Sequence, residues 1–159
     1  MSPWVPATAG DAPPRADVLD DLGSWLVSDA WVLAAVRVTG TQELPARLVD
    51  VIIAADAMNH LVLSQRELEH AVARLVPAGL VEVDTRGFAV TWYGRRLVAL
   101  ARGEAPQRMA ALHELLEGVD VVAEPWMLDE GEYQRACLEY RHTVFEGYRR
   151  ETRSLRRFG

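Results

Sequence analysis

The sequence predicts a mostly α-helical protein with one two-stranded hairpin near its middle and a helical C-terminal extension. Apolar residues recur at helical spacing over most of the chain from residue 28 onward. Residues 81–90 alternate between apolar and polar side chains on either side of a DTRG turn. The segment SQRE, residues 64–67, is a capping box, which marks the start of a helix just before the hairpin.

Composition indicates a globular chain of about one domain. Half of its 159 residues are hydrophobic, which is enough to form a sizeable core. The only cysteine, Cys137, allows no intrachain disulfide, and we find neither a signal peptide nor a membrane span, so we expect a cytoplasmic location. All 17 basic residues are arginine, which is typical of a protein from a GC-rich bacterium.

The net charge of −6 is unevenly distributed. Residues 1–24 carry −3, residues 25–102 are neutral, residues 103–140 carry −7 and residues 141–159 carry +4. A strongly basic nucleic-acid-binding protein would have a different profile. Charge therefore gives no independent support for binding to DNA.

Proline content and capping signals divide the chain into three parts. Residues 1–16 hold four of the eight prolines and predict a flexible N-terminal arm. Residues 17–102 hold the main run of helices and the hairpin. Residues 103–159 form a helical extension that ends in a basic tail. We expect one compact domain followed by this extension.

The helices of the middle part are predicted from their ends. A short helix near residue 17 precedes a longer one that Ser28 or Asp29 caps and Gly40 follows. The next helix covers residues 45–59, with a proline in its first turn. The capping box then starts a helix over residues 64–76, and Thr91 caps one more helix after the hairpin.

This order of elements, together with the segments AGLVEV, FAVT and TWYG, resembles the winged helix-turn-helix of bacterial regulators of the MarR and PadR type. The resemblance covers residues 29–102. It implies that the helix over residues 64–76 is a recognition helix, that the hairpin is the wing, and that the protein is a small DNA-binding transcriptional regulator. Winged helices also serve as protein-docking modules, so an accessory or interaction module that does not bind DNA is the alternative function.

The resemblance assigns candidate DNA-binding residues to the helix and to the hairpin turn. The face of the helix opposite its apolar stripe carries arginine, histidine and alanine, which suit a major groove, and an arginine at the turn suits phosphate or a minor groove. The candidates are Gln65, Arg66, His70, Ala73, Arg74 and Arg86. The acidic residues Glu67 and Glu69 leave this helix neutral, and only Glu67 is explained by capping.

The C-terminal extension predicts two more helices. Residues 105–117 have apolar residues at helical spacing with Gly118 as a stop, and Asp129 caps a helix from residue 130 to about residue 155, which is about 39 Å long. The apolar stripe of this long helix comprises Tyr133, Cys137, Tyr140, Val144 and Tyr148. Its spacing suits packing against another helix, either in a homodimer, as the resemblance implies, or within the same chain.

Two other constellations bear on chemistry. ELEH, residues 67–70, and EYRH, residues 139–142, share the Glu-x-x-His spacing of di-iron bundles, but they lie off the apolar stripes, whereas metal ligands must project inward. Trp25, Trp31 and Trp126 could line an aromatic ligand pocket between the first and the terminal helix, with ordinary core packing as the alternative. We therefore expect no catalytic residue, no metal and no cofactor.

Overall fold

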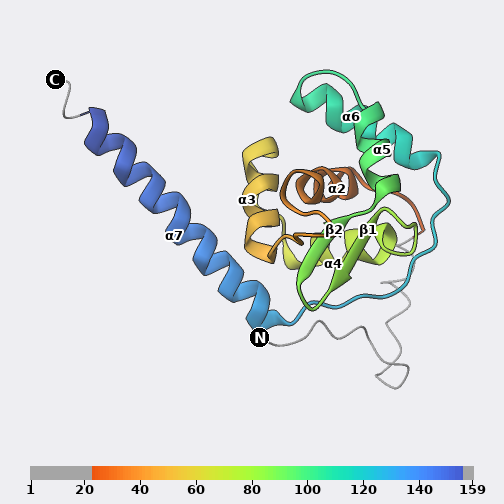
Figure 1. The fold of residues 1–159 in the computed structure, drawn as a ribbon, viewed down its shortest axis with the longest axis horizontal. Coiled ribbons are helices and arrows are strands. Elements are labelled where there is room, and N and C mark those ends of the chain that lie inside the picture. The colour runs from red at the N-terminus through yellow and green to blue at the C-terminus, as the bar shows by residue number, and fades with distance from the viewer. Residues whose placement is uncertain (1–22, 156–159) are drawn as a thin grey trace.

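The computed structural model describes residues 23–155, with side chains to residue 150 (Figure 1). The predicted arm over residues 1–16, the short helix near residue 17 and the last residues of the basic tail lie outside this range. The described part is mostly helical with one two-stranded antiparallel sheet. Its elements are α2 (Val27–Thr39), α3 (Leu48–Asn59), α4 (Gln65–Leu75), β1 (Val81–Asp84), β2 (Gly87–Val90), α5 (Trp92–Leu100), α6 (Ala105–Glu117) and α7 (Glu130–Leu155).

Two helix starts differ from the prediction. Helix α2 begins at Val27, so Asp29 lies in its first turn, from which its carboxylate accepts the N–H of the N-cap residue Leu26 at 2.7 Å. Helix α3 begins at Leu48, three residues after the proline that was placed in its first turn. Ala46 instead forms an isolated β-bridge with Phe88, in which the Ala46 and Phe88 N–H groups donate to each other's carbonyl oxygens at 2.7 and 2.9 Å. Because Ala46 pairs with β2, helix α3 begins only at Leu48.

The ends of α4 and α5 follow the sequence closely. The Glu67 N–H donates to the Ser64 hydroxyl at 3.2 Å, and the Ser64 N–H donates to the Glu67 carboxylate at 2.8 Å, which completes the capping box. The Gly94 N–H donates to the Thr91 hydroxyl at 3.0 Å. Between these caps, β1 and β2 pair in the register that joins Val81 to Val90.

One hydrophobic core includes residues of both the predicted middle part, residues 17–102, and the predicted extension, residues 103–159. Buried residues of α2, α3 and α4 belong to the same cluster as Leu112 and Leu116 of α6 and Leu128, which precedes α7. Helix α6 packs on α2 and α5. The extension is thus a part of the core and not an appendage to a domain that ends at residue 102.

Helix α7 lies against α3 with its first half only (Figure 1). Tyr133, Ala136, Cys137 and Tyr140 pack against the core, whereas every residue from 141 to 150 is exposed. The second half of the helix therefore projects away from the body. No helix in the described range is long and apolar enough to cross a membrane.

Candidate functional site: helix α4, the hairpin and the segment that covers them

Two of the six predicted DNA-binding residues are not on the surface. Ala73 is 2% exposed and Arg74 is fully buried, so the assignment of both to an open helix face is wrong. Arg66 is exposed, His70 is half-buried, and both make further contacts. The helical wheel separates the core stripe correctly, but it cannot tell solvent from another part of the same chain.

The guanidinium of Arg74 is buried together with the carboxylate of Asp29, with which it pairs. Its Nε and Nη2 atoms donate to the two carboxylate oxygens of Asp29, each at 2.8 Å. The Asp29 carboxylate also accepts the Leu26 N–H at 2.7 Å. Burial nevertheless raises the pKa of Asp29 above its ordinary value, because the loss of hydration outweighs these hydrogen bonds. This bidentate pair joins α4 to the first turn of α2.

The side of α4 that carries Gln65, Glu69 and Ala73 lies under residues 119–129, which we call the covering segment. It is an extended stretch that runs from α6 past the hairpin to α7 (Figure 1). Its proline, Pro125, lacks the N–H that a helix requires and favours an extended conformation in the residue before it. The covering segment therefore crosses the surface as an open chain.

Three hydrogen bonds hold the covering segment along nearly the whole of α4. The Glu124 N–H donates to the Ala73 carbonyl oxygen at 2.9 Å. The Leu128 N–H donates to the Glu69 carboxylate at 2.9 Å, and the Gln65 side-chain amide donates to the Leu128 carbonyl oxygen at 3.0 Å. Gln65 and Glu69 thus bind the chain itself. This is the role of Glu69 that capping could not explain.

The covering segment also fills the space between α4 and the hairpin. Leu128 is buried in the core, and the ring of Trp126 meets the edge of Phe88 on β2 with centroids 6.3 Å apart. A cavity of about 340 Å³ remains here, lined by Val72, Val76, Pro77, Val83, Asp84, Thr85, Glu124, Pro125 and Trp126. Trp126 therefore belongs to the hairpin side of the molecule.

The three tryptophans do not form the predicted pocket. Trp25 is buried, and its indole N–H donates to the Val119 carbonyl oxygen at 2.8 Å near the end of α6. Trp31 packs half-buried against the core, and Trp126 lies at the hairpin. The alternative of ordinary packing describes them better than a site between α2 and α7.

An ion pair between Arg86 and Asp84 spans the hairpin turn. The Arg86 guanidinium donates to the Asp84 carboxylate at 2.9 and 3.1 Å, and this hydrogen-bonded cation holds the pKa of Asp84 below its ordinary value. Both side chains remain largely exposed. A cavity of about 450 Å³ separates the turn from α7, and its lining includes Arg86, Arg47, Glu132, Arg135 and Glu139. Acidic residues of α7 therefore lie beside the turn.

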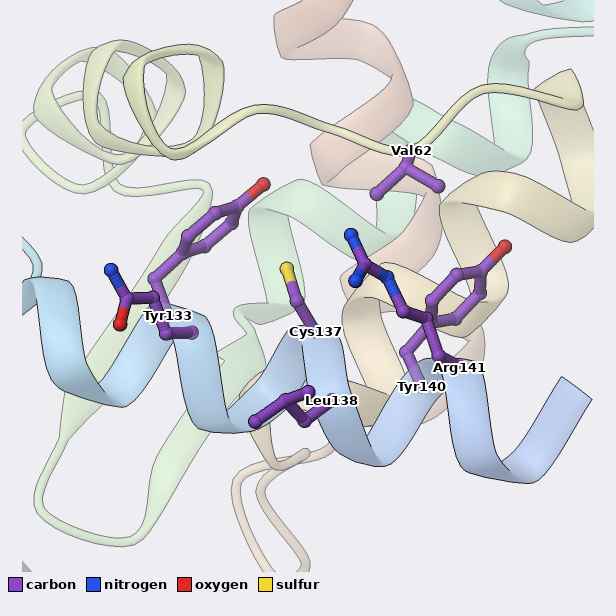
Figure 2. A pocket seen from close by; sticks show the side chains of 7 residues that line it. Val62, Tyr133, Cys137, Leu138, Tyr140 and Arg141 are labelled. Atoms are coloured by element: carbon purple, nitrogen blue, oxygen red, sulfur yellow. The ribbon is translucent and has the colours of Figure 1, made fainter.

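The two halves of the apolar stripe predicted for α7 have different surroundings. In its first half, the Tyr133 hydroxyl donates to the Leu63 carbonyl oxygen at 2.8 Å and the Tyr140 hydroxyl donates to the Asp56 carboxylate at 2.9 Å. Burial raises the pKa of Tyr133 to about 12. Figure 2 shows Tyr133, Cys137 and Tyr140 pointing from α7 toward the loop that carries Val62, across a cavity of about 450 Å³. These three residues follow the intramolecular alternative.

The second half of the stripe reaches solvent. Val144 is 37% exposed and Tyr148 69% exposed, and Phe145 beside them is 65% exposed. The Arg149 guanidinium lies over the Phe145 ring at 5.7 Å from its centroid. These side chains form an apolar surface on the part of α7 that projects from the body.

No group of three metal-ligating side chains occurs within the part of the chain that the structure describes. Of the two Glu-x-x-His segments, Glu67 serves the capping box, Glu69 holds the covering segment, and Glu139 pairs with Arg47 at 2.9 Å. Their carboxylates therefore have structural partners.

Comparison with known proteins gives no relative. No protein-family model matches the chain, and neither a curated protein nor a solved structure matches it.

Proposed function

We propose that this protein is a winged-helix module for binding another protein, and that it assembles as a homodimer through α7. The observation that carries the proposal is the cover on α4, since the covering segment binds Gln65 and Ala73, two residues of the helix face that a DNA-reading winged helix inserts into the major groove. The position of Glu69 on this face supports the same interpretation.

The order of elements supports the winged-helix part of the proposal. Helices α2, α3 and α4 precede the β1–β2 hairpin. Ala46, in the loop that joins α2 to α3, pairs with the edge of β2 that does not bind β1. In this interpretation α4 is the recognition helix and the hairpin is the wing. Its fold alone assigns no partner, because winged helices bind both DNA and proteins.

Charge and geometry disfavour double-stranded DNA as the partner. Of the predicted reading face, Arg74 is neutralised by Asp29, and Arg86 at the turn is neutralised by Asp84. The net charge of the chain is −6. Affinity for DNA depends on cations that replace the counterions of phosphate, and few cations are available near α4.

The first test is DNA binding itself. We expect the wild-type chain to retain no duplex from a sheared genomic DNA pool in a mobility-shift assay at low salt. A retained duplex whose affinity falls by about 1–3 kcal/mol on Arg66→Ala would contradict the proposal and support a DNA-binding regulator instead. Arg108→Ala on α6 is the matched control, because it removes an exposed arginine away from α4.

The homodimer rests on the second half of α7. Residues 141–150 project from the body, and they include the exposed apolar residues Val144 and Phe145. Within α7, residues 130–140 carry −2 and residues 141–155 carry +2, so antiparallel α7 helices that overlap along their length would place opposite charges side by side. A two-fold dimer of this kind buries the same stripe on both copies.

Charge placed on the exposed apolar surface of Val144 and Phe145 tests the dimer. Val144→Glu combined with Phe145→Glu is expected to give monomers in light scattering, because two carboxylates per chain would be desolvated at the interface. Both side chains are exposed within one chain, so the fold should survive. Val122→Glu, at an exposed apolar residue of the covering segment, is expected to remain dimeric. A wild-type chain that is monomeric at micromolar concentration would refute the dimer.

A further inference from the structure

Helix α5 presents an exposed face that the fold does not use. Gly94 and Leu97 are buried against the body and fix the position of the helix. On its outer side Trp92 is 67% exposed, Tyr93 is 45% exposed and Leu100 is 62% exposed. Side chains this large and apolar are normally placed where they lose contact with water. We call Trp92, Tyr93, Arg95, Arg96 and Leu100 the α5 face.

The α5 face is positively charged, unlike the molecule as a whole. Its two charged residues, Arg95 and Arg96, are both arginines, and residues 85–103 contain no acidic residue. The Arg96 guanidinium lies over the Trp92 ring at 5.0 Å from its centroid, and Arg95 forms no ion pair with any residue that the structure describes. Both arginines are thus exposed, and Arg96 lies against the Trp92 ring.

Tryptophan, tyrosine and arginine are the residues most enriched among the energetic centres of protein interfaces. The α5 face contains two aromatic residues and two arginines on a nine-residue helix. The helix is anchored by the Thr91 cap and by its buried side, so these side chains are presented on a rigid element. Binding through a rigid face loses less conformational entropy than binding through a mobile loop.

We propose that the α5 face docks an acidic peptide segment of a partner protein, with an apolar side chain of that segment packed against Trp92 and Leu100. Carboxylates of the segment would pair with Arg95 and Arg96. This inference rests on the proposed function, since it names the class of partner that the module binds. Charge complementarity selects an acidic partner, and the apolar Leu100 on the same face selects a peptide over a phosphate backbone.

The net charge of the chain favours a short acidic peptide over a polyanion. A nucleic acid or an anionic membrane surface is large enough to meet much of the surface of a molecule whose net charge is −6, and that repulsion opposes binding. A peptide with a few carboxylates interacts mainly with the local arginines, because exposed charges farther away than about 8–10 Å are screened at physiological salt.

The test uses the full-length protein and an array of acidic peptides that contain Asp, Glu and Leu, with Gln-for-Glu versions of the same peptides beside them. We expect binding of acidic peptides and loss of binding to the neutral versions. For the tightest peptide, Trp92→Ala and Arg96→Glu should each weaken binding about tenfold or more in fluorescence anisotropy.

The control variant is Arg135→Glu, which makes the same change of charge at an exposed arginine of α7. It should change peptide affinity by much less than Arg96→Glu does. Equal losses in the two variants would show general charge attraction and would overturn the proposal, as would the absence of any peptide that binds. Tighter binding to single-stranded oligonucleotides or to phosphatidylglycerol vesicles would also overturn it.

Failure of this inference is distinguishable from failure of the proposed function. Duplex DNA retained through Arg66 would refute the protein-binding module, whatever the peptides do. The absence of both DNA and peptide binding would refute only the α5 face as the docking site. Both substituted side chains of the α5 face are exposed, so we expect each variant to keep its fold. Circular dichroism of each variant checks this.

Discussion

Arg74→Ala is expected to lower the free energy of unfolding by about 3–5 kcal/mol, the largest effect of any single substitution that we propose. Arg74 and Asp29 are both fully buried and bind each other through two hydrogen bonds of 2.8 Å. Removal of the guanidinium leaves a buried carboxylate without its cation. The transition in urea, followed by circular dichroism at neutral pH, measures the loss.

Two controls separate the buried pair from an ordinary salt bridge. Arg47→Ala removes an ion pair in which the arginine side chain is 59% exposed, and we expect a loss of less than about 1 kcal/mol. The double substitution Arg74→Met with Asp29→Leu should be nearly neutral, because it removes both charges and keeps the volume filled. A loss for Arg74→Ala no larger than that for Arg47→Ala would contradict the structure around α4.

Gly94→Ala is the second large effect, with an expected loss of about 3 kcal/mol. A Cβ atom at Gly94 would lie 2.1 Å from the Leu80 carbonyl oxygen and 3.1 Å from Cγ2 of Val90. The Leu80 carbonyl oxygen already accepts the Thr91 N–H at 3.1 Å, so the backbone at this junction cannot shift without breaking that bond. Urea unfolding again provides the measurement.

The matched control for this substitution is Gly147→Ala on the projecting half of α7. Apart from the backbone of its own helix turn and its chain neighbours, no atom lies within 4 Å of a Cβ placed there, and alanine favours a helix over glycine by about 1 kcal/mol. The same change should therefore leave stability unchanged or raise it slightly. A similar loss at both positions would mean that helix propensity, and not the close approach to Leu80, explains Gly94.

Gly94 also explains the spacing of the motif TWYG. Thr91 caps α5 by accepting the Gly94 N–H, and its own hydroxyl donates to the Gly79 carbonyl oxygen at 2.6 Å. The threonine thus ties the start of α5 to the turn before β1, and the glycine lets α5 approach that turn. A local cap and a long-range contact require the two residues together.

The sequence by itself determined the elements whose signals are local. Ser64 with Glu67, Thr91 and Asp129 each mark a helix start that the structure has, because a cap is made by atoms within about three residues of one another. Gly118 ends α6 and the DTRG turn joins the strands for the same reason. The apolar spacing also identified the core stripe of α4 and the first half of the α7 stripe, Tyr133, Cys137 and Tyr140.

Only the tertiary structure decided what lies on the other faces of those helices. Asp29 is a residue type that caps helices, and its carboxylate does accept the Leu26 N–H, but it also binds Arg74, 45 residues away. Gln65, Glu69 and Ala73 look like an open surface in the periodicity of α4, and the covering segment from more than 50 residues later lies on them. Periodicity records which side of a helix faces the core, but a polar face bound to the backbone of its own chain and a polar face bound to water require the same residue types.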